Sequence, residues 1–448
     1  MDRRDVLKNG AAAVIGGTAG MLGGRAEAAQ APAQAPGIVR GGSAGRPFRA
    51  WVRSGTQIQM ENLRTLPLGP RSVLIRTEAT QCCYSMVGEV LAPTAQTPPK
   101  IIGHGGVGIV EDVGVQVKRV RVGDRVIVAN TPQCGTCANC LQGRSDMCDV
   151  KMMALVPVAE RADGTRVVGH NNYGGFADLM VSFEEYLVPT VTTVPPVELA
   201  VLSCVGAAGL AASITFVPIQ PGTNVAVMGC GPIGLSAVQG ARIAGAKQII
   251  AVEPIAYRRE LATKLGATTV LDPNVEGAGL VAKITDMCKG EMNNLFGGGR
   301  NLNEGGAAGG FGVSRVRPYG PDFVIEAVGA NRFPPRAGSG PDPTGLTALR
   351  QSYLMTGGTG HLTTTGVYQG ELTLPAGTFS ISGRTHHSGQ LGGGANSFRD
   401  MPRFVRLIEK GLFDAKSMAT GIYRLEQVKE AFQAAADRTT LTALIVFS

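Results

Sequence analysis

The stretch from Asn224 to Glu253, NVAVMGCGPIGLSAVQGARIAGAKQIIAVE, decides the fold of this chain. An apolar run over 225–228 predicts a buried strand, a helix pattern of small residues follows, and a second apolar strand ends at Glu253. Between the first strand and the helix lie three glycines at the spacing of a dinucleotide-binding fingerprint: Gly229, Gly231 and Gly234. The stretch therefore predicts a doubly wound α/β domain that binds a dinucleotide.

Each fingerprint residue has a physical role. Gly229 permits the tight turn, Gly231 lets a pyrophosphate approach the backbone, and Gly234 lets the helix lie close to the strand. Pro232 and Ile233 open the helix, whose N-terminus faces the phosphates. We expect all five residues to contact the cofactor.

The acidic residue at the end of the second strand indicates which dinucleotide is bound. The Glu253 carboxylate is placed to accept both hydrogen bonds from an adenosine ribose diol and to repel a 2′-phosphate, which favours NAD over NADP. Arg258 follows five residues later, and we expect it to pair with the adenosine end of the cofactor. A solvated surface arginine is the alternative interpretation of Arg258.

Composition limits the class of protein. A chain of 448 residues is long enough for two or three domains, and 17% charged residues with 63 glycines favour a compact, loop-rich α/β protein. The formal net charge of +8 is spread along the chain and is not interleaved with aromatic residues. We therefore expect no nucleic-acid partner.

The sequence pattern of the N-terminal segment differs from that of the rest of the chain. A pair of arginines at 3–4 precedes a Gly/Ala-rich, weakly apolar stretch over 10–24 and an A-x-A pattern at 26–28. This order is typical of a bacterial twin-arginine export signal, which we place at residues 1–29. Residues 30–46 are expected to form a flexible tether, and no permanent membrane span is expected. The signal predicts a periplasmic protein; a cytoplasmic protein with an ordinary N-terminal tail is the alternative.

Four of the nine cysteines lie close together in a loop rich in Gly, Pro and Asn. They are spaced C-x2-C-x2-C-x7-C and comprise Cys134, Cys137, Cys140 and Cys148. Four thiolates at this spacing predict one tetrahedral structural zinc with no open position. Disulfides and an iron–sulfur cluster are the alternatives, but nothing nearby in the sequence suggests an electron path.

Three further residues suggest a second metal site. Cys83 and His104 precede the four-cysteine lobe, and Cys204 follows it. Each alone is explained as an ordinary core residue. Together, two thiolates and an imidazole supply three ligands for a zinc whose fourth position stays open to water or a substrate oxygen.

These residues and motifs resemble the zinc-dependent medium-chain alcohol dehydrogenase family. The resemblance runs from about Gly69 to the C-terminus. Besides the lobe, Cys204 and the fingerprint, it rests on G-H-x-x-x-G-x-V at 103–110, G-D-R-V at 123–126, L-G-A at 265–267 and V-I-E-A-V-G at 324–329. It implies a GroES-like β-barrel catalytic domain, built from both ends of the chain, with a doubly wound Rossmann domain inserted between them.

The resemblance also implies roles for particular residues. Cys83, His104 and Cys204 would hold the catalytic zinc, and Ser85 would relay the alcohol proton. The zinc would act as a Lewis acid while a hydride passes between an alcohol and NAD. A small alcohol or aldehyde substrate, two zinc ions in each chain, and a homodimer or homotetramer are therefore expected.

The chain departs from the family at five positions. Gly105 and Met86 stand where the family usually has acids, so carboxylates that would orient the ligands are missing. Gly88 replaces a relay histidine found in some members. Tyr84 and Thr442 stand where some members have basic residues that grip the pyrophosphate. Proton exit and cofactor binding are therefore expected to differ from the best-known members.

The pattern along the chain predicts three folded segments. They are a catalytic domain at 47–218 with the zinc lobe at 130–150, a Rossmann domain at 219–389 with insertions at 287–321 and 330–345, and a return to the catalytic domain at 390–448. Insertions of that length are usually functional. We expect them to cover the cofactor or to form a partner surface, with inert insertions as the alternative.

Export constrains the mechanism, because a free NAD pool is not expected outside the inner membrane. We therefore hypothesise that NAD(H) stays tightly bound as a prosthetic group and that electrons pass to an external acceptor or to a second, carbonyl-bearing substrate. One alternative is a freely exchanging NAD-dependent alcohol dehydrogenase. A second alternative is a non-catalytic member of the fold that binds zinc and nucleotide.

Overall fold

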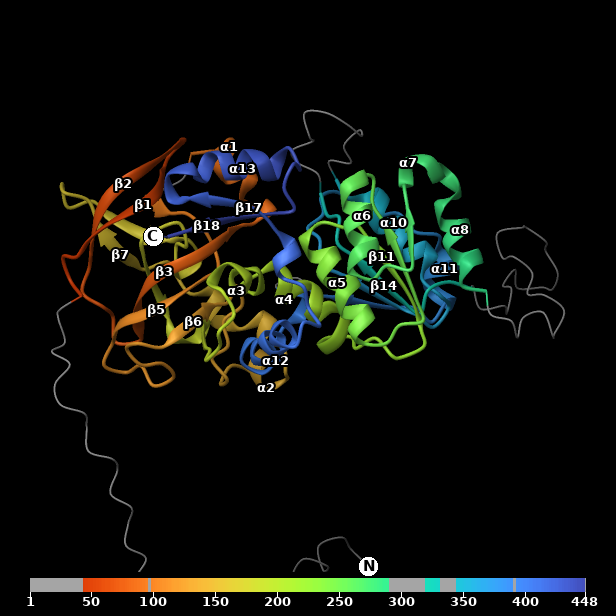
Figure 1. Ribbon diagram of the computed structural model, residues 1–448, viewed down its shortest axis with the longest axis horizontal. Coiled ribbons are helices and arrows are strands. Elements are labelled where there is room, and N and C mark those ends of the chain that lie inside the picture. The colour runs from red at the N-terminus through yellow and green to blue at the C-terminus, as the bar shows by residue number, and fades with distance from the viewer. Residues whose placement is uncertain (1–42, 96–97, 290–318, 331–343, 390–391, 448) are drawn as a thin grey trace, which may run out of the picture. The chain divides into compact units, whose positions relative to one another are not determined.

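The stretch 224–253 forms the centre of a six-stranded sheet in the computed structural model, which describes residues 43–95, 98–289, 319–330, 344–389 and 392–447 (Figure 1). The strands are β11 (Asn224–Met228), β12 (Gln248–Val252), β13 (Thr269–Leu271), β14 (Phe323–Glu326), β15 (His361–Thr364) and β16 (Thr385–Ser388). Their order is β13-β12-β11-β14-β15-β16, and every neighbouring pair is parallel. The chain therefore winds outward from β11 in both directions, as a doubly wound sheet does.

Alternate residues of β11 face two helical layers. Val225 and Val227 pack in the same core as helix α5 (Pro232–Ile243). Ala226 and Met228 pack in a second core, with helices α8 (Leu280–Met287) and α10 (Leu346–Met355). Because side chains alternate across a strand, an uninterrupted apolar run is what a sheet covered on both faces requires.

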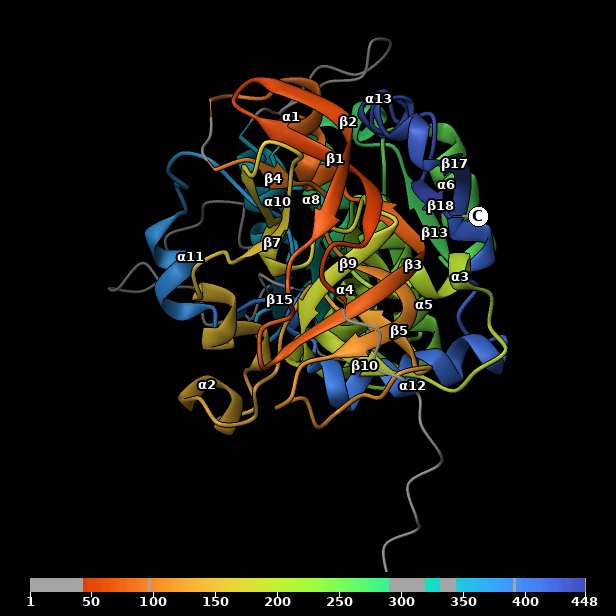
Figure 2. The ribbon, with the colours of Figure 1, turned by 90° about the vertical axis from the view of Figure 1, so that its left-hand side faces the viewer.

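The strands in the rest of the described chain form a closed barrel and a second sheet. A closed barrel runs through β1 (Pro47–Ser54), β2 (Gln57–Thr65), β7 (Pro157–Glu160), β8 (Arg166–Gly169) and β4 (Lys100–Ile101). Figure 2 shows β1, β2, β4 and β7 on the side that faces the viewer. A seven-stranded sheet contains β10 (Leu187–Pro189), β6 (Arg125–Val128), β5 (Gly106–Val113), β3 (Ser72–Cys82), β18 (Thr442–Val446) and β17 (Ala419–Arg424), with β9 (Leu179–Phe183) paired to β3.

The C-terminal end of the described chain returns to this sheet. Strand β18 pairs antiparallel with β3, and Ala443 lies opposite Cys82. Figure 1 shows the blue strands β17 and β18 beside the orange strand β3, under helix α13 (Val428–Ala436). The C-terminal return thus fixes the strand that leads directly into Cys83.

Two short helices join the β-rich part to the parallel sheet. Helix α3 (Pro196–Leu202) is followed by α4 (Val205–Leu210), which packs on α5. The contact is close, because a Cβ on Gly209 would lie 2.2 Å from the carbonyl oxygen of Ile233. Glycine at this position therefore lets the helix that follows Cys204 lie against the fingerprint helix.

The remaining described helices are peripheral. They are α1 (Val87–Leu91), α2 (Ala138–Leu141), α6 (Ala256–Leu265), α7 (Pro273–Glu276), α11 (Ala376–Ile381) and α12 (Ser397–Glu409). Among the described residues no single helix has the length and hydropathy to span a membrane, although α3 and the segment 205–215, bent by 49°, meet those criteria as a pair. The predicted export signal, most of the tether and most of both insertions lie outside the described residues.

Candidate active site and metal centres

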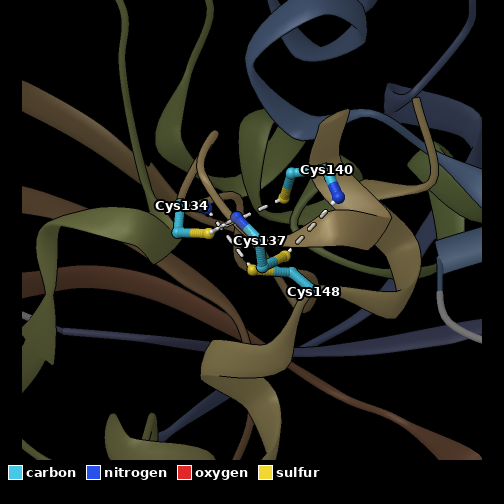
Figure 3. Close-up of side chains that lie close together, drawn as sticks. All are labelled: Cys134, Cys137, Cys140 and Cys148. Carbon is cyan, nitrogen blue, oxygen red and sulfur yellow. Dashed lines mark hydrogen bonds between the residues drawn. The ribbon is translucent and has the colours of Figure 1, made fainter. Parts of the chain in front are cut away.

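The four cysteines of the lobe converge on one point (Figure 3). Their sulfur atoms all lie within 4.8 Å of one another. A zinc–sulfur bond of about 2.3 Å in a tetrahedron places neighbouring sulfurs about 3.8 Å apart. The Sγ atoms of Cys134 and Cys140 are 3.9 Å apart, so the lobe has the dimensions of a closed four-thiolate zinc site.

Backbone and side-chain donors favour the thiolate of Cys134, whereas burial raises the pKa of the Cys140 and Cys148 thiols. The backbone N–H of Cys137 donates to Cys134 Sγ at 3.3 Å, and that of Cys134 donates to Cys148 Sγ at 3.4 Å. Burial opposes ionisation of Cys134, but hydrogen bonds from Thr136 and Cys137 lower its pKa to about 6. These hydrogen bonds therefore favour the thiolate of Cys134, which is the form that binds a metal.

The loop around the lobe is tied to helix α12. The Ser397 hydroxyl donates to the carbonyl oxygen of Thr131 at 2.8 Å, and the backbone N–H of Phe398 donates to Gln133 Oε1 at 3.0 Å. Helix α12 packs in turn against α3 and α4. The lobe thus connects to the helices on either side of Cys204.

The second predicted trio also converges. The ligand atoms of Cys83, His104 and Cys204 lie within 4.8 Å of one another. For bonds of about 2.3 Å to sulfur and about 2.0–2.1 Å to nitrogen, a tetrahedral zinc places sulfur and nitrogen about 3.6 Å apart. The Sγ atom of Cys204 lies 3.5 Å from Nε2 of His104, so the trio fits a zinc with one open position.

Three separate elements bring these ligands together. Cys83 follows β3, His104 lies in the loop after β4, and Cys204 immediately precedes α4. Hydrogen bonds from the Cys204 thiol, then from His104 and from Ser85, hold the pKa of the Cys83 thiol well below its usual range. The Ser85 hydroxyl donates to Cys83 Sγ at 3.1 Å and is exposed to solvent.

The missing carboxylates have a steric explanation. Gly105 has φ +73°, and a Cβ there would lie 2.7 Å from Ser203 Oγ. Met86 is 2% exposed and packs in the core with Val87 and Val90. Gly105 therefore has no room for a side chain, and an acid at Met86 would bury a charge among apolar side chains. No hydrogen bond joins a carboxylate to His104 among the described residues.

Replacing Gly105 by alanine is expected to destabilise the fold by about 2 kcal/mol, through left-handed backbone strain and the clash with Ser203. Gly123→Ala is the matched control, because Gly123 has φ +94° and no described atom lies within 4 Å of its added Cβ. Urea unfolding of both variants measures the difference. Equal losses of stability in the two variants would show that the Ser203 contact is irrelevant.

The fingerprint turn has the geometry that its predicted roles require. Gly229 has φ +86°, which is the left-handed conformation of a tight turn. A Cβ on Gly234 would lie 1.8 Å from the carbonyl oxygen of Gly229, so the helix could not approach the strand with any other residue there. A Cβ on Gly231 would meet only the Arg258 guanidinium, at 3.9 Å, among the described residues. Space for a phosphate therefore remains beside Gly231, where Pro232 and Ile233 begin α5.

Glu253 has a structural task beyond the one expected. It is 4% exposed; its Oε2 accepts the backbone N–H of Cys230 at 2.7 Å, and its Oε1 accepts that of Ile255 at 3.0 Å. The carboxylate therefore holds the fingerprint turn, while each oxygen keeps a second lone pair for a ribose hydroxyl.

Arg258 is buried beside the fingerprint. Its side chain lies near Gly231, its Nε donates to the Tyr257 hydroxyl at 3.0 Å, and the residue is only 9% exposed. The alternative of a solvated surface arginine is therefore wrong. The position fits a contact with the cofactor.

Other charged residues near the site gave no signal in the sequence. Glu89, Lys100 and His170 form a cluster behind His104, and the Arg438 guanidinium lies 5.9 Å from the centre of the Tyr84 ring. Burial lowers the pKa of His170 well below its usual range. Only the strand pairing reveals these neighbours, which lie far apart along the chain.

A closed barrel joined to a doubly wound parallel sheet, with an open three-ligand centre at the junction, defines a medium-chain dehydrogenase. The chain belongs to the zinc-dependent alcohol dehydrogenase family. Residues 69–194 match the alcohol dehydrogenase GroES-like domain, and residues 232–337 match the zinc-binding dehydrogenase domain. The fold class expected from the sequence is thus confirmed, as is membership of a family of zinc- and nicotinamide-dependent oxidoreductases.

Relatives span nearly the whole chain. The chain is 30% identical over 419 residues to an NDMA-dependent alcohol dehydrogenase of Amycolatopsis methanolica, covering 91% of this chain and 97% of the relative. It is 28% identical over 390 residues to putative alcohol dehydrogenase D of Mycobacterium tuberculosis, covering 84% and 93%.

Solved structures share the fold. Benzyl alcohol dehydrogenase from Acinetobacter calcoaceticus aligns with a TM-score of 0.73 and 23% identity, over 90% of this chain and 100% of that chain. An alcohol dehydrogenase zinc-binding domain protein from Burkholderia ambifaria aligns with a TM-score of 0.73 and 24% identity, over 90% and 99%. At these identities the likeness establishes the fold alone.

Proposed function

We propose that this chain oxidises a small alcohol with two zinc ions and a tightly bound NAD(H), and that electrons then pass to a second reactant without release of the nucleotide. The observation that carries the proposal is the position of the open three-ligand centre. Its ligand Cys204 precedes α4, the helix that packs directly on the fingerprint helix α5. The metal would therefore bind at the start of α4 and the dinucleotide at the start of α5, and these two helices are in direct contact.

The side chains around the trio would hold the metal and move a proton. A bound zinc supplies a Lewis acid and the bound nicotinamide accepts a hydride. Cys83, His104 and Cys204 hold the metal with one position open to the substrate oxygen. The exposed Ser85 hydroxyl takes the alcohol proton, and because Gly88 carries no side chain, the proton passes from Ser85 to solvent.

The pyrophosphate of the cofactor would be bound by different residues from those used in the best-known members. Tyr84 and Thr442 offer no cation, but the Arg438 guanidinium lies over the Tyr84 ring. The Tyr257 hydroxyl donates to the carbonyl oxygen of Arg438 at 2.9 Å and accepts the Nε hydrogen of Arg258 at 3.0 Å. Tyr257 thus links the side chain of Arg258 to the backbone of Arg438, and we infer that the two guanidinium groups bind the pyrophosphate. The left-handed conformation of Arg438, with φ 57°, is the kind of backbone strain often found at functional sites.

Arg438→Gln is therefore expected to weaken retention of the nucleotide by about tenfold, as loss of one charge-assisted hydrogen bond of about 1.5 kcal/mol predicts. The measurement is NAD(H) extracted from each purified chain after stepwise dialysis. Arg406→Gln, at an exposed position on α12, is the matched control. Equal retention by Arg438→Gln and the wild type would remove Arg438 from the cofactor site.

Purification without added nucleotide tests the proposed function itself. After exhaustive dialysis the wild type is expected to retain NAD(H) and to oxidise alcohols when NDMA, the compound in the relative's name, is the only added co-reactant. An empty protein that turns over only with added NAD supports the freely exchanging dehydrogenase instead. A protein that binds zinc and nucleotide but converts none of a panel of primary, secondary, aromatic and terpenoid alcohols supports the non-catalytic alternative.

We also propose that the folded, cofactor-loaded chain is exported by the twin-arginine route to the periplasm. The arginine pair at 3–4, the apolar stretch and the A-x-A pattern support this. Cell fractionation is expected to recover a shortened protein in the periplasm, and the double variant Arg3→Lys with Arg4→Lys is expected to stay in the cytoplasm. Recovery of full-length wild type in the cytoplasm would contradict export.

Assembly as a homodimer or homotetramer remains a prediction from the family resemblance. Light scattering of the purified protein measures the mass in solution. A mass of one chain would contradict the prediction.

A further inference from the structure

A buried charged cluster lies directly behind the ligand His104. The ring of His170 stacks on that of His104, with centroids 5.9 Å apart and planes 24° apart. Glu89 Oε2 lies 3.5 Å from His170 Nδ1, and Glu89 Oε1 lies 2.6 Å from Lys100 Nζ and 3.4 Å from Arg53 Nη1. The cluster therefore connects one face of a metal-ligand ring to three charged groups.

The barrel's strand pairing brings this cluster together. Arg53 on β1 lies opposite Lys100 on β4. Ile101 on β4 lies opposite Gly169 on the parallel strand β8, and the chain continues from these two residues to His104 and His170, respectively. The two imidazoles thus leave adjacent strands on the same side, which explains the stack.

Glu89 is the one carboxylate that the described contacts place in this cluster. Arg53 and Lys100 are like charges on directly opposed residues, and their side chains are only 7% and 8% exposed. Such a pair is unfavourable unless an acid compensates it. Glu89 does so, and its Oε2 lies 3.5 Å from His170 Nδ1. The edge of the His170 ring therefore lies against a carboxylate whose own position is fixed by two cations, although Nδ1 makes no hydrogen bond among the described residues.

We propose that His170 is the positioning residue of the catalytic metal centre: packed beside Glu89, it fixes the ring of His104 by stacking and so replaces the orienting carboxylates absent at Met86 and Gly105. The inference rests on the proposed function, since it takes His104 as a metal ligand. It accounts for a ligand histidine that no described carboxylate bonds directly. Groups outside the ligand set commonly change metal affinity about 10- to 100-fold.

The experiment compares Co²⁺-loaded wild type with His170→Ala and His170→Phe. Phenylalanine keeps an aromatic face against His104 but lacks the Nδ1 atom that faces Glu89. Release of Co²⁺ to a chelator and the cobalt absorption bands are measured, because both report on the centre independently of turnover. Slow release from the four-cysteine lobe is the control within each sample, and His386→Phe, on β16, is the control variant.

In His170→Ala, release from the three-ligand centre is expected to be about tenfold faster or more, with shifted cobalt bands and a fall in kcat larger than any change in KM. His170→Phe is expected to show release and cobalt bands between those of His170→Ala and the wild type. Release from the lobe is expected to stay unchanged in both variants. Unchanged bands and release rate in His170→Ala would overturn the inference, as would equal acceleration at both sites. A wild type that binds only one cobalt per chain, in the lobe, would instead refute the proposed function.

Discussion

Cys204→Ala is expected to lower the metal content from two ions to one per chain and to reduce kcat by about a thousand-fold. The reason is that two remaining ligands do not hold a zinc in an open tetrahedral site, and the Lewis acid is lost with it. A thousand-fold loss corresponds to about 4 kcal/mol of transition-state stabilisation, within the range expected for such a metal. Metal analysis and steady-state kinetics of the purified variant measure both effects.

Cys288→Ala is the matched control for this substitution. Cys288 is also a buried cysteine, but it belongs to neither metal cluster. Cys288→Ala is expected to lower the free energy of unfolding through lost packing and to leave both metals in place. If Cys204→Ala kept two metals and most of its kcat, Cys204 would not be a ligand of the catalytic centre.

Cys148→Ala is expected to lower the free energy of unfolding by more than about 3 kcal/mol, since structural zinc sites contribute roughly 10 kcal/mol or more to the folding of isolated zinc peptides. Cys148 is 1% exposed, and its loss opens a site in which four thiolates are needed. The loop also ties α12 to the rest of the catalytic part, so the effect is expected to spread beyond the lobe. Urea unfolding measures the change.

The matched control is Cys204→Ala, which empties the open centre and leaves the closed one intact. It is expected to lose much less stability than Cys148→Ala, and limited proteolysis within 134–148 is expected to cut only the Cys148 variant. If Cys204→Ala lost more stability than Cys148→Ala, the assignment of one structural and one catalytic metal would be contradicted.

The parts of the site that the sequence predicts best are those encoded by close spacing. The four lobe cysteines lie within one loop, and the fingerprint glycines lie between one strand and one helix, so their neighbours in space are also neighbours in sequence. Cys83, His104 and Cys204 were predicted only as a set and through the family resemblance. Their convergence depends on where β3 and β4 end and where α4 begins.

What the sequence did not reveal depends on strand register and side-chain packing. Glu253 bonds the fingerprint turn because β12 lies beside β11, and His170 stacks on His104 because β8 pairs with β4. The sequence shows Gly105 as a departure from the family, but only packing shows that Ser203 occupies the space beside it. Such contacts join residues that a single chain, read without its fold, does not connect.

The fold itself followed from the order of its motifs. The fingerprint stretch predicts the strand at 225–228, observed as β11 at Asn224–Met228, and the helix after it. The resemblance supplies the barrel and the C-terminal return. Both predicted insertions fall largely outside the described residues, so their role in covering the cofactor stays a prediction.

The most direct test of the central claim is an anomalous difference map, recorded at the zinc absorption edge from crystals of the purified protein. The account predicts two peaks per chain, one among the four lobe cysteines and one among Cys83, His104 and Cys204, the second beside density for a dinucleotide in front of Gly231. A single peak in the lobe, with Cys83, His104 and Cys204 bound to no metal, would contradict it.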